Sequence, residues 1–547
     1  MAGLVLVSCF VGPVPMAAAE AASAAECVAT TKQGTLRGRA DEGMCRYHGV
    51  RYAAPPVGDR RFRAPAPPPR WSGVRRVGRP SNVVCPRVAP NIGESYVGGR
   101  SVAKEDCLRL SITAPHSRSA SPRPVIVYLH GGGFFSGSGA QADFDGARLA
   151  RTGDAVIVRV NYRLGLLGWM ELGGASKSFA GSGNNGLRDQ VAALRWVRRN
   201  IGAFGGDPGN VTLMGQSAGA TSISAMLATA EPQRLMRRAI VVSGNGYLMK
   251  SRARAAAVSR ELLQIAGTDD PRRLQRMSVA DLMAVQSAYF TKHPLQQGSI
   301  FAPIIDGNLV RGTTVQRLAH GHAKGIDLII GTTKEETTFF ALLSPPLYYL
   351  PPLANPFFPN ELRAQQVPMI ATYQANRPDA LLVPRHGGVL HAMMSDQMFR
   401  VPATRMAEAQ SRWADVYAYR FDWHLPEKPV QPPGDQLGAF HTLDVQHIFG
   451  SLRFGWVPRA PELDATQLDA ARRLSRSMQL AYATFARAGT PNADGGAAPH
   501  WARYDARRRA TMIWDTRTTR TNAPADDERA LWDDFAFHHF AFPLPVG

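Results

Sequence analysis

Short runs of apolar residues recur along most of the chain, separated by longer polar and amphipathic stretches. Between two of these runs, apolar residues follow helical spacing from Leu187 to Ile201, and Gly205 and Gly206 mark the end of that helix. Strands that alternate with helices favour a mostly parallel sheet with right-handed crossovers, so the pattern predicts an α/β fold. The runs predicted to be strands are 124–129, 155–160, 211–214, 239–242, 328–330, 416–421 and 511–514.

Two segments differ from this pattern. Residues 27–112 are predicted to be β-rich and to contain an antiparallel hairpin made of 28–37 and 44–52. Residues 340–435 follow a proline-rich pattern typical of an insertion at the substrate pocket, within one domain over 27–547. Aromatic residues near the start of this insertion predict either a substrate pocket or ordinary core packing. They are Phe339, Phe340, Tyr348, Tyr349, Phe357 and Phe358.

A glycine-flanked serine follows the predicted strand 211–214. Residues 215–219 read Gly-Gln-Ser-Ala-Gly, and small residues compatible with a helix continue from 220 to 228. A strand, a sharp turn with serine at its apex and a helix form the nucleophile elbow of α/β-hydrolases, where glycines leave room for the neighbouring backbone. Ser217 is therefore the candidate nucleophile.

A second glycine-rich turn follows the predicted strand 124–129 and reads His-Gly-Gly-Gly-Phe over residues 130–134. Glycines allow backbone N–H groups to approach a substrate oxygen closely. The N–H groups of Gly132 and Gly133, with that of Ala218 after the candidate nucleophile, are predicted to form an oxyanion hole. The alternative interpretation of these glycines is a flexible loop.

A catalytic serine needs a general base and a carboxylate that orients the base, and in α/β-hydrolases the acid and then the histidine follow the serine. Glu335 and Glu336 both come after the predicted strand 328–330, so either would lie at a carboxyl end of the sheet. Small residues before His441 place it in a predicted loop. Spacing alone leaves the base open among His386, His391, His424, His441, His447, His500, His538 and His539.

The ordered motifs of the chain resemble those of the type-B carboxylesterase/lipase family, which includes cholinesterases and bacterial p-nitrobenzyl esterases. The resemblance runs from about residue 30 to the C-terminal region and implies an α/β-hydrolase fold with a mostly parallel central sheet flanked by helices. It places the catalytic triad on Ser217, Glu336 and His441, because the family's acid follows a Lys-Asp-Glu-like run and its base lies in Gly-x-x-His. The matching segments are 52–58, 61–62, 105–108, 130–134, 161–165, 183–190, 204–208 and 215–219.

The resemblance also implies structural roles. Ser243 is similar to the family's serine beside the triad acid, and is equally well interpreted as a serine at a strand end. Two buried ion pairs and one disulfide are expected by the same resemblance: Arg61 with Glu105, Arg163 with Asp189, and Cys85 with Cys107.

Two departures from cholinesterases disfavour a choline ester. Gln216 stands where cholinesterases carry a glutamate, and Tyr96 is the one aromatic residue in the loop where they carry a tryptophan. Both of those family residues help to hold a quaternary ammonium. Gln216 also brings no charge to His441 from that side.

The N-terminus and the cysteines predict export. An apolar run at 4–10 and an alanine-rich stretch at 17–25 predict a signal peptide over residues 1–26, with a disordered tail as the alternative. Four of the five cysteines lie within 27–107, an even number suited to disulfides in an oxidising compartment. Cys27 and Cys45 bracket the predicted hairpin and are predicted to pair. A secreted or periplasmic protein is therefore expected.

Composition limits the remaining classes of function. The formal net charge is +20, but the arginines match no nucleic-acid motif, so no nucleic-acid partner is expected. No apolar run of about 18 residues follows the N-terminus, so no transmembrane segment is expected. The sequence predicts a serine carboxylesterase for a small-molecule ester, with no metal and no cofactor. The alternatives are a lipase, an esterase for a large natural ester, and a non-catalytic binding module.

Overall fold

The computed structural model describes residues 27–88, 101–117, 119–230, 232–294, 300–343, 360–377, 388–426, 437–454, 457 and 462–537. Several predictions from the sequence fall outside these residues. They concern the signal peptide over 1–26, Tyr96, the histidines 386, 538 and 539, and the aromatic residues 348, 349, 357 and 358.

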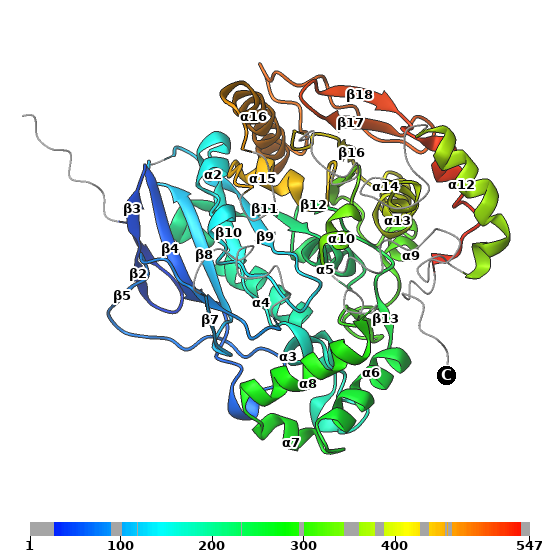
Figure 1. Cartoon of the computed structure of the whole chain (residues 1–547). Helices are drawn as coiled ribbons and strands as arrows, with labels where there is room; N and C mark the ends of the chain where they lie inside the picture. Colours follow the sequence, from blue (N-terminus) through cyan, green and yellow to red (C-terminus); the bar gives the residue numbers. More distant parts are fainter. Residues whose placement is uncertain are drawn as a thin grey trace, which may run out of the picture.

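A central sheet of eleven strands runs through the molecule in the order β18-β17-β16-β15-β12-β11-β9-β10-β8-β4-β3 (Figure 1). Within the run from β17 to β10 all neighbouring strands are parallel. The pairings outside this run, towards both edges of the sheet, are antiparallel. Their bounds are β3 (Arg39–Asp41), β4 (Met44–Arg51), β8 (Arg109–Pro115), β9 (Arg123–Leu129), β10 (Val156–Val160), β11 (Gly206–Gln216), β12 (Arg238–Val242), β15 (Asp327–Thr333), β16 (Val416–Phe421), β17 (Ala510–Trp514) and β18 (Thr519–Asn522).

Both faces of the parallel part of this sheet are buried, which explains why most positions of its strands are apolar. In β9, Val125, Val127 and Leu129 enter one hydrophobic core, while Ile126 and Tyr128 enter another on the opposite face. Side chains alternate between the two faces of a strand, and parallel sheets are covered on both sides, so no polar position interrupts such a strand.

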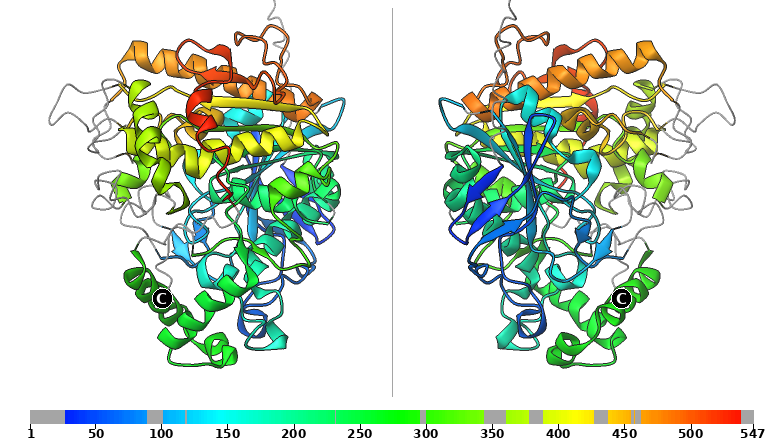
Figure 2. Two further views of the ribbon diagram at one scale, coloured as in Figure 1. Left: turned by 90° about the vertical axis from the view of Figure 1, so that its right-hand side faces the viewer. Right: turned by 90° about the vertical axis from the view of Figure 1, so that its left-hand side faces the viewer.

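Helices cover the two faces of the sheet. One layer packs around α16, and the other contains the helix that begins at Ser217. Figures 1 and 2 show a further group of helices beyond one end of the sheet. The first layer is α2 (Ala147–Gly153), α15 (Leu443–Phe449) and α16 (Ala465–Ala488). The second is α4 (Asn185–Asn200), α5 (Ala218–Leu227), α9 (Thr314–Ala319) and α14 (Val401–Gln410). The further group is α3 (Gly165–Trp169), α6 (Arg252–Ile265), α7 (Pro271–Arg276) and α8 (Val279–Lys292).

The mostly parallel α/β-hydrolase sheet expected from the sequence is confirmed, and the predicted strand 416–421 matches β16 to the residue. The helix predicted from Leu187 to Ile201 is α4, and a turn after it ends at Gly205 with φ 79°. The predicted strand 211–214 is too short, because β11 begins at Gly206 and has an irregular register before Val211.

The N-terminal segment is β-rich as expected, but the single hairpin predicted from 28–37 and 44–52 is wrong. β1 (Val28–Thr30) pairs with β2 (Thr35–Arg37) in a separate sheet, and β5 (Val74–Arg76) joins β2 there in parallel. The second half of the predicted hairpin is β4, which pairs with β3 and β8 in the central sheet. The chain crosses between the two sheets at Gly38, where a Cβ would lie 2.6 Å from the Arg46 carbonyl oxygen.

Both disulfides expected from the sequence are present. Cys27 is bonded to Cys45 although these residues do not face each other across one hairpin, and Cys85 is bonded to Cys107. Because β1 and β4 belong to different sheets, the first bond fastens the small N-terminal sheet to the central one.

The two ion pairs implied by the family resemblance are also present. Arg163 donates two hydrogen bonds of 2.7 Å to the Asp189 carboxylate, and both side chains are buried. Arg61 bonds both oxygens of Glu105, at 2.7 and 2.6 Å, and also donates to the backbone carbonyls of Gln275 and Met277. Arg61 thereby ties the N-terminal segment to the residues around α7.

The range 340–435, proposed above as a pocket insertion, includes β16 and α14, which belong to the sheet and to its helical layer. The other described elements of this range are α10 (Thr338–Leu343), η9 (Asn360–Gln365), α12 (Gln366–Ala375), α13 (Val389–Ser395) and the π-helical turn η10 (Asp396–Arg400). The range 340–435 therefore also contains parts of the core fold, and the substrate-pocket insertion stays a prediction.

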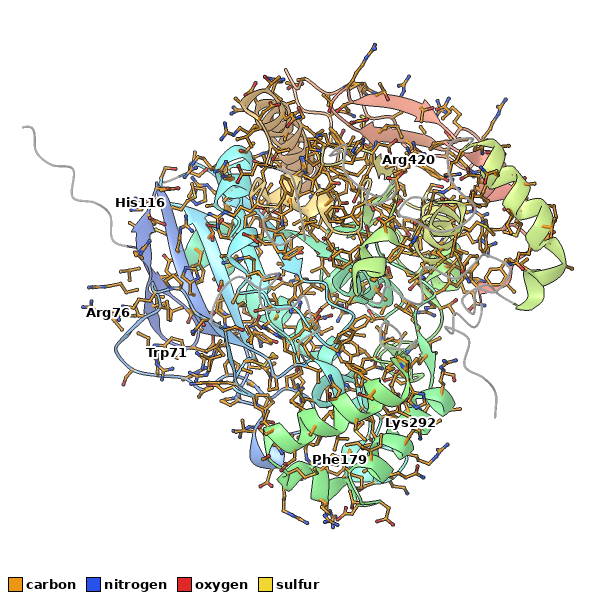
Figure 3. All side chains as sticks on the ribbon, in the orientation of Figure 1. Trp71, Arg76, His116, Phe179, Lys292 and Arg420 are labelled. Atoms are coloured by element: carbon orange, nitrogen blue, oxygen red, sulfur yellow. A yellow bond between two sulfur atoms is a disulfide. The ribbon has the colours of Figure 1, made fainter. Side chains whose placement is uncertain are left out.

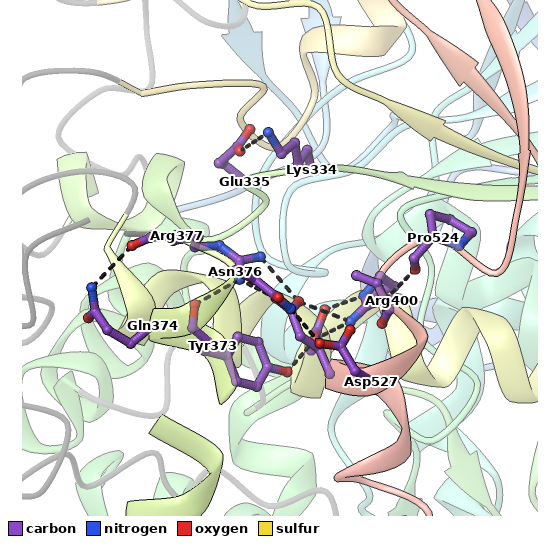
Figure 4. A network of polar contacts seen from close by, with 12 residues as sticks. Lys334, Glu335, Tyr373, Gln374, Asn376, Arg377, Arg400, Pro524 and Asp527 are labelled. Carbon is purple, nitrogen blue, oxygen red and sulfur yellow. Dashed lines mark hydrogen bonds and ion pairs between the residues drawn. The ribbon is translucent and has the colours of Figure 1, made fainter. Parts of the chain in front are cut away.

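A polar network fastens the π-helical turn to the C-terminal part of the chain (Figure 4). Arg400 bonds Asp396 within the turn and donates to the carbonyls of Pro524 and Ala525, each at 3.0 Å. Arg377, at the end of α12, pairs with Glu528 on α17 (Asp526–Ala530). The turn is thus held from two sides by charged groups.

Among the helices that the structure describes, none combines the length and the apolar character needed to cross a membrane.

Candidate active site

Ser217 lies between β11 and α5, at the turn predicted from the glycine-flanked motif. Its φ of 55° is in the left-handed region, and its N–H donates to the Val242 carbonyl at 2.9 Å. A Cβ on Gly219 would lie 2.1 Å from the Leu129 carbonyl oxygen, so only glycine fits beside the neighbouring strand. Ser217 is half-buried whereas the residues on either side of it are buried. The turn therefore presents the hydroxyl of a strained serine, as in a nucleophile elbow.

The glycine-rich turn after β9 has its carbonyl groups fixed by hydrogen bonds. His130 Nδ1 lies 2.8 Å from the Gly131 carbonyl oxygen, and the Gly132 carbonyl accepts the N–H groups of Phe135 and Ser136 at 3.1 and 2.9 Å. The C=O and N–H of one trans peptide point in opposite directions. Because the carbonyls of Gly131 and Gly132 are fixed, the N–H groups of Gly132 and Gly133 point away from the groups that bond those carbonyls.

This turn lies directly against the elbow. A Cβ on Gly131 would lie 3.0 Å from Ser217 Cβ and 2.2 Å from Gln216 Oε1. Burial lowers the pKa of His130 to about 4, so near neutral pH its ring is uncharged. The same ring stacks on Tyr162 at 4.4 Å, and the Tyr162 hydroxyl donates to the His130 carbonyl. These contacts hold the predicted oxyanion donors in place beside Ser217.

Of the candidate histidines that lie within the described residues, His441 is the one whose ring contacts a predicted acid. Its Nδ1 lies 2.5 Å from Glu336 Oε2, and both side chains are buried. The second oxygen of Glu336 accepts the N–H of Thr333 at 2.8 Å. A carboxylate fixed in this way holds the imidazole with its Nδ1–H donated and its Nε2 unprotonated, as a general base requires.

Glu335, the other candidate acid, has a different role. Its Oε2 accepts the N–H of Ala439 at 2.9 Å, and its own N–H donates to the Ala439 carbonyl at 3.0 Å. A Cβ on Gly438 would lie 2.8 Å from this carboxylate. Glu335 therefore holds the backbone of the loop that carries His441, while Glu336 contacts the ring.

Gln216 contacts the catalytic candidate from the opposite side. Its Nε2 lies 3.0 Å from His441 Nε2, and the side chain is buried. With Nδ1–H directed to Glu336, the unprotonated Nε2 accepts this amide hydrogen bond. The sequence placed Gln216 next to the triad, on the side of His441, as an uncharged residue. It did not predict this hydrogen bond to a residue 225 positions later.

Three phenylalanines surround His441. The rings of Phe340 and Phe399 lie 5.2 and 4.9 Å from the imidazole, and Phe339 lies at 6.2 Å. Phe340 and Phe399 stack in parallel with an interplanar angle of 5°. Phe339 is also a buried member of a hydrophobic core, as the core-packing interpretation predicts, whereas the partly buried Phe340 fits an aromatic wall beside the site. Phe399 was missed by the sequence analysis, because it lies on the π-helical turn η10, which has no periodic pattern.

The remaining candidates lie elsewhere or have other partners. His447 is buried among Phe421, Trp423 and Phe454, and burial lowers its pKa to about 3. Ser243 has a φ of 52°, and its buried hydroxyl makes no hydrogen bond within the described part of the chain. The structure therefore gives no contact between Ser243 and Glu336. The other candidate histidines within the described residues have different partners: His391 bonds Thr337, His424 bonds the Leu425 carbonyl and His500 bonds Asn492.

Among the described residues, one group brings three residues with metal-ligating atoms close to one another, namely Cys27, Cys45 and His116. Because the two cysteines are joined in a disulfide, this group is not a preformed metal site.

Asp444 is a buried carboxyl group three residues after His441. Burial, and then the charge of Glu336, raise its pKa to about 7, although the Tyr419 hydroxyl donates to it at 2.8 Å. In an unfolded chain the same group has a pKa of about 4. The folded state therefore keeps a proton on Asp444 that the unfolded state loses as the pH rises, and stability falls through this window.

We expect Asp444→Asn to be more stable relative to wild type at pH 8 than at pH 5. The amide cannot ionise, so the variant avoids a cost of up to about 4 kcal/mol that the carboxylate brings above its folded pKa. Thermal unfolding of both proteins at the two pH values measures this. The exposed Asp494→Asn is the control and should show no such difference. Equal changes at both pH values for Asp444→Asn would contradict the assignment.

Comparison with known proteins connects this geometry to a family. A model of the carboxylesterase family matches residues 25–532. The para-nitrobenzyl esterase of Bacillus subtilis is 35% identical over 92% of this chain and 97% of its own length. The phenmedipham hydrolase of Pseudarthrobacter oxydans is 31% identical over 89% of this chain and 94% of its own.

Solved structures agree with the sequence relatives. A thermophilic PNB esterase superimposes with a TM-score of 0.77 and 34% identity, over 92% of this chain and 99% of the other. The carboxylesterase of Geobacillus stearothermophilus superimposes with the same TM-score and 32% identity, over 92% of this chain and 100% of its own.

Proposed function

Since the chain belongs to the carboxylesterase family and is a carboxylic ester hydrolase, we propose that it cleaves esters with a triad of Ser217, His441 and Glu336. The observation that carries the proposal is the 2.5 Å contact between His441 and Glu336 in a buried site beside the strained Ser217. A buried acid–imidazole pair next to a half-buried serine nucleophile is the arrangement that acyl transfer needs.

In the proposed reaction His441 Nε2 accepts the proton of Ser217 as Oγ attacks the ester carbonyl. Gln216 must release Nε2 for this step, because the amide and the serine hydroxyl compete for the same lone pair. Glu336 stabilises the imidazolium that forms. His441 then protonates the leaving alcohol, and in the second half of the reaction it activates water to release the acid.

The negative charge that develops on the carbonyl oxygen is met by the N–H groups of Gly132, Gly133 and Ala218. Support for this comes from the hydrogen bonds that fix the carbonyls of Gly131 and Gly132, since donors held in advance need no reorganisation during the reaction. Ala218 begins α5, so its N–H is one of those that lack a partner within the helix.

The proposed substrate is a small neutral ester. Gln216 brings no negative charge to hold a quaternary ammonium, and Phe340 and Phe399 give the pocket an apolar, aromatic wall. Relatives are named for para-nitrobenzyl esters and for phenmedipham, both of which suggest aryl-containing test substrates. We also propose export to the periplasm or the medium, which the two disulfides support.

The test is hydrolysis of p-nitrophenyl esters of increasing acyl length together with labelling by a fluorescent alkyl phosphonate. We expect turnover of short acyl esters, and a single phosphonylated peptide that contains Ser217. A preference for long acyl chains that rises sharply at a lipid–water interface would indicate a lipase instead. Labelling without turnover would point to a specialised, larger ester, and absence of both in the folded protein would overturn the triad.

A further inference from the structure

The positive charge of this protein is concentrated near its N-terminus. Residues 27–88 contain thirteen arginine and lysine residues and three acidic ones, and so supply about half of the net charge of +20. Between residues 60 and 93 there are eight arginines and no aspartate or glutamate. The rest of the chain is more than seven times as long and carries the other half of the net charge.

Three of these cations, Arg37, Arg75 and Arg76, lie on the small sheet β1-β2-β5. Residues paired across neighbouring strands point to the same side, and successive residues alternate. The register places Val28, Arg37 and Arg76 in one row, and Thr35 and Val74 in the next row on the same side. On the opposite side Ala29 and Leu36 are buried, and the third residue of that row, on the edge strand β5, is the exposed Arg75. The outward side therefore carries arginine together with valine.

Five exposed cations of this region have no acidic partner among the described residues. Within the described part of the chain, Lys32, Arg70, Arg75, Arg76 and Arg79 are exposed and form no ion pair with aspartate or glutamate. The nearby Asp41 and Glu42 already contact other arginines. Arg76 shares the outward side of the sheet with the exposed Val28 and Val74, Arg75 lies on the other side of the edge strand β5, and Lys32, Arg70 and Arg79 lie in the adjoining loops. These five cations and two valines are together called the basic face.

The segment that carries most of the basic face is held firmly. The Trp71 N–H donates to the Gln33 carbonyl at 2.9 Å, and the Val77 N–H donates to the Arg37 carbonyl at 2.9 Å. The Arg75 guanidinium lies 4.5 Å from the centre of the Trp71 ring. Figure 3 shows Arg76 projecting outward from this side of the molecule. The charges are thus displayed on a fixed surface.

We propose that the basic face binds the surface of a membrane rich in anionic lipids. Unpaired guanidinium groups match lipid phosphates in charge and in hydrogen-bonding geometry. The valines favour a lipid surface over a soluble polyanion: Val28 is 40% and Val74 is 53% exposed, on the same side as Arg76. Apolar side chains among cations gain from the boundary between headgroups and acyl chains, which a nucleic acid or acidic polysaccharide does not offer.

The basic face is separate from the catalytic candidates. β2 and β5 lie at one edge of the molecule in Figure 1, whereas α5 and α10, next to Ser217 and Glu336, lie near its centre. Binding through this face would hold the enzyme at a membrane without using any residue of the proposed triad. Ester hydrolysis in solution therefore serves as the measure of correct folding for every variant.

The experiment is co-sedimentation of the full chain with vesicles of phosphatidylcholine alone, or mixed with an equal amount of phosphatidylglycerol. We expect binding to the mixed vesicles only, and weaker binding as salt is added. Each basic residue near an anionic surface contributes about fivefold to partitioning, so Arg75→Gln/Arg76→Gln/Arg79→Gln should bind about 100-fold less.

The matched control is Arg195→Gln/Arg472→Gln/Arg476→Gln, which removes the same charge from exposed positions on α4 and α16 and should change binding far less. A second variant, Val28→Ser/Val74→Ser, keeps every charge and should weaken vesicle binding but not binding to double-stranded DNA. The proposal is overturned if the mixed vesicles are not bound, or if the control loses as much binding. It is also overturned if DNA binds as tightly and the valine variant behaves as wild type.

Discussion

Replacing Ser217 with alanine is expected to lower kcat for a p-nitrophenyl ester about a million-fold, to a rate near that left by binding and oxyanion contacts alone. The alanine has no oxygen to form the acyl-enzyme, and His441 then has no proton to accept. Ser217 occupies a strained backbone position that alanine tolerates about as well as serine does, so folding should be preserved. Steady-state kinetics, with circular dichroism to check the fold, measure the effect.

The control for this variant is Ser243→Ala. Ser243 is also a serine with positive φ at a strand end, and its hydroxyl makes no hydrogen bond among the described residues. Removal of a hydroxyl without a partner should leave kcat within about threefold of wild type. A large loss in Ser243→Ala, or substantial residual turnover in Ser217→Ala, would contradict the proposed roles.

Glu336→Gln is expected to lower kcat about 10,000-fold while leaving the protein folded. The neutral amide no longer stabilises the imidazolium. An amide N–H directed at His441 Nδ1 also favours the tautomer in which Nε2 carries the proton, and that tautomer cannot accept one from Ser217. The measurement is kcat as a function of pH. Loss of the carboxylate weakens the base and should lower kcat at every pH, rather than only shift one limb of the pH profile.

Glu335→Gln is a closely matched control, since it changes the adjacent residue in the same way. Its carboxamide oxygen can still accept the Ala439 N–H, so the loop that carries His441 keeps its position. We expect a loss of less than about tenfold, since a hydrogen bond is retained and only a charge outside the triad is removed. A reversal of the two effects would show that the neighbouring glutamate is the acid.

The fold was largely predictable because its signal is local. Runs such as 416–421 are buried on both faces at nearly every position, so their predominance of apolar and aromatic residues located them. The hairpin prediction failed for a non-local reason: Gly38 sends the chain into a second sheet, and nothing in the alternation of 28–37 and 44–52 distinguishes pairing partners in different sheets. The start of β11 at Gly206 was hidden by polar residues that precede its apolar part.

The candidate site was likewise predictable where its signal is local and not where it depends on distant residues. Ser217 and the glycine-rich turn were evident from the residues, because a tight turn imposes its own sequence. The choice of Glu336 over Glu335 needed the family resemblance, and the structure supports it with a contact that no spacing reveals. Phe399 and the bond from Gln216 to His441 were not foreseen. Both residues lie more than 40 positions from His441 in sequence, and Phe399 lies on an irregular helical turn, so only the three-dimensional structure brings them to His441.

The order of strands in the sheet has a consequence for how the protein is made. After β9 and β10 have paired, β11 is added to the free edge of β9. Each later strand of this part of the sheet then pairs with the one before it, in the order of synthesis: β12, β15, β16 and β17. Both disulfides close within the first 107 residues, over separations of 18 and 22. The sheet can therefore grow vectorially from a cross-linked N-terminal end. The serine turn is complete once β12 supplies the Val242 carbonyl, but His441 is added only after β16 has joined, so a partly synthesised chain carries the nucleophile without its base.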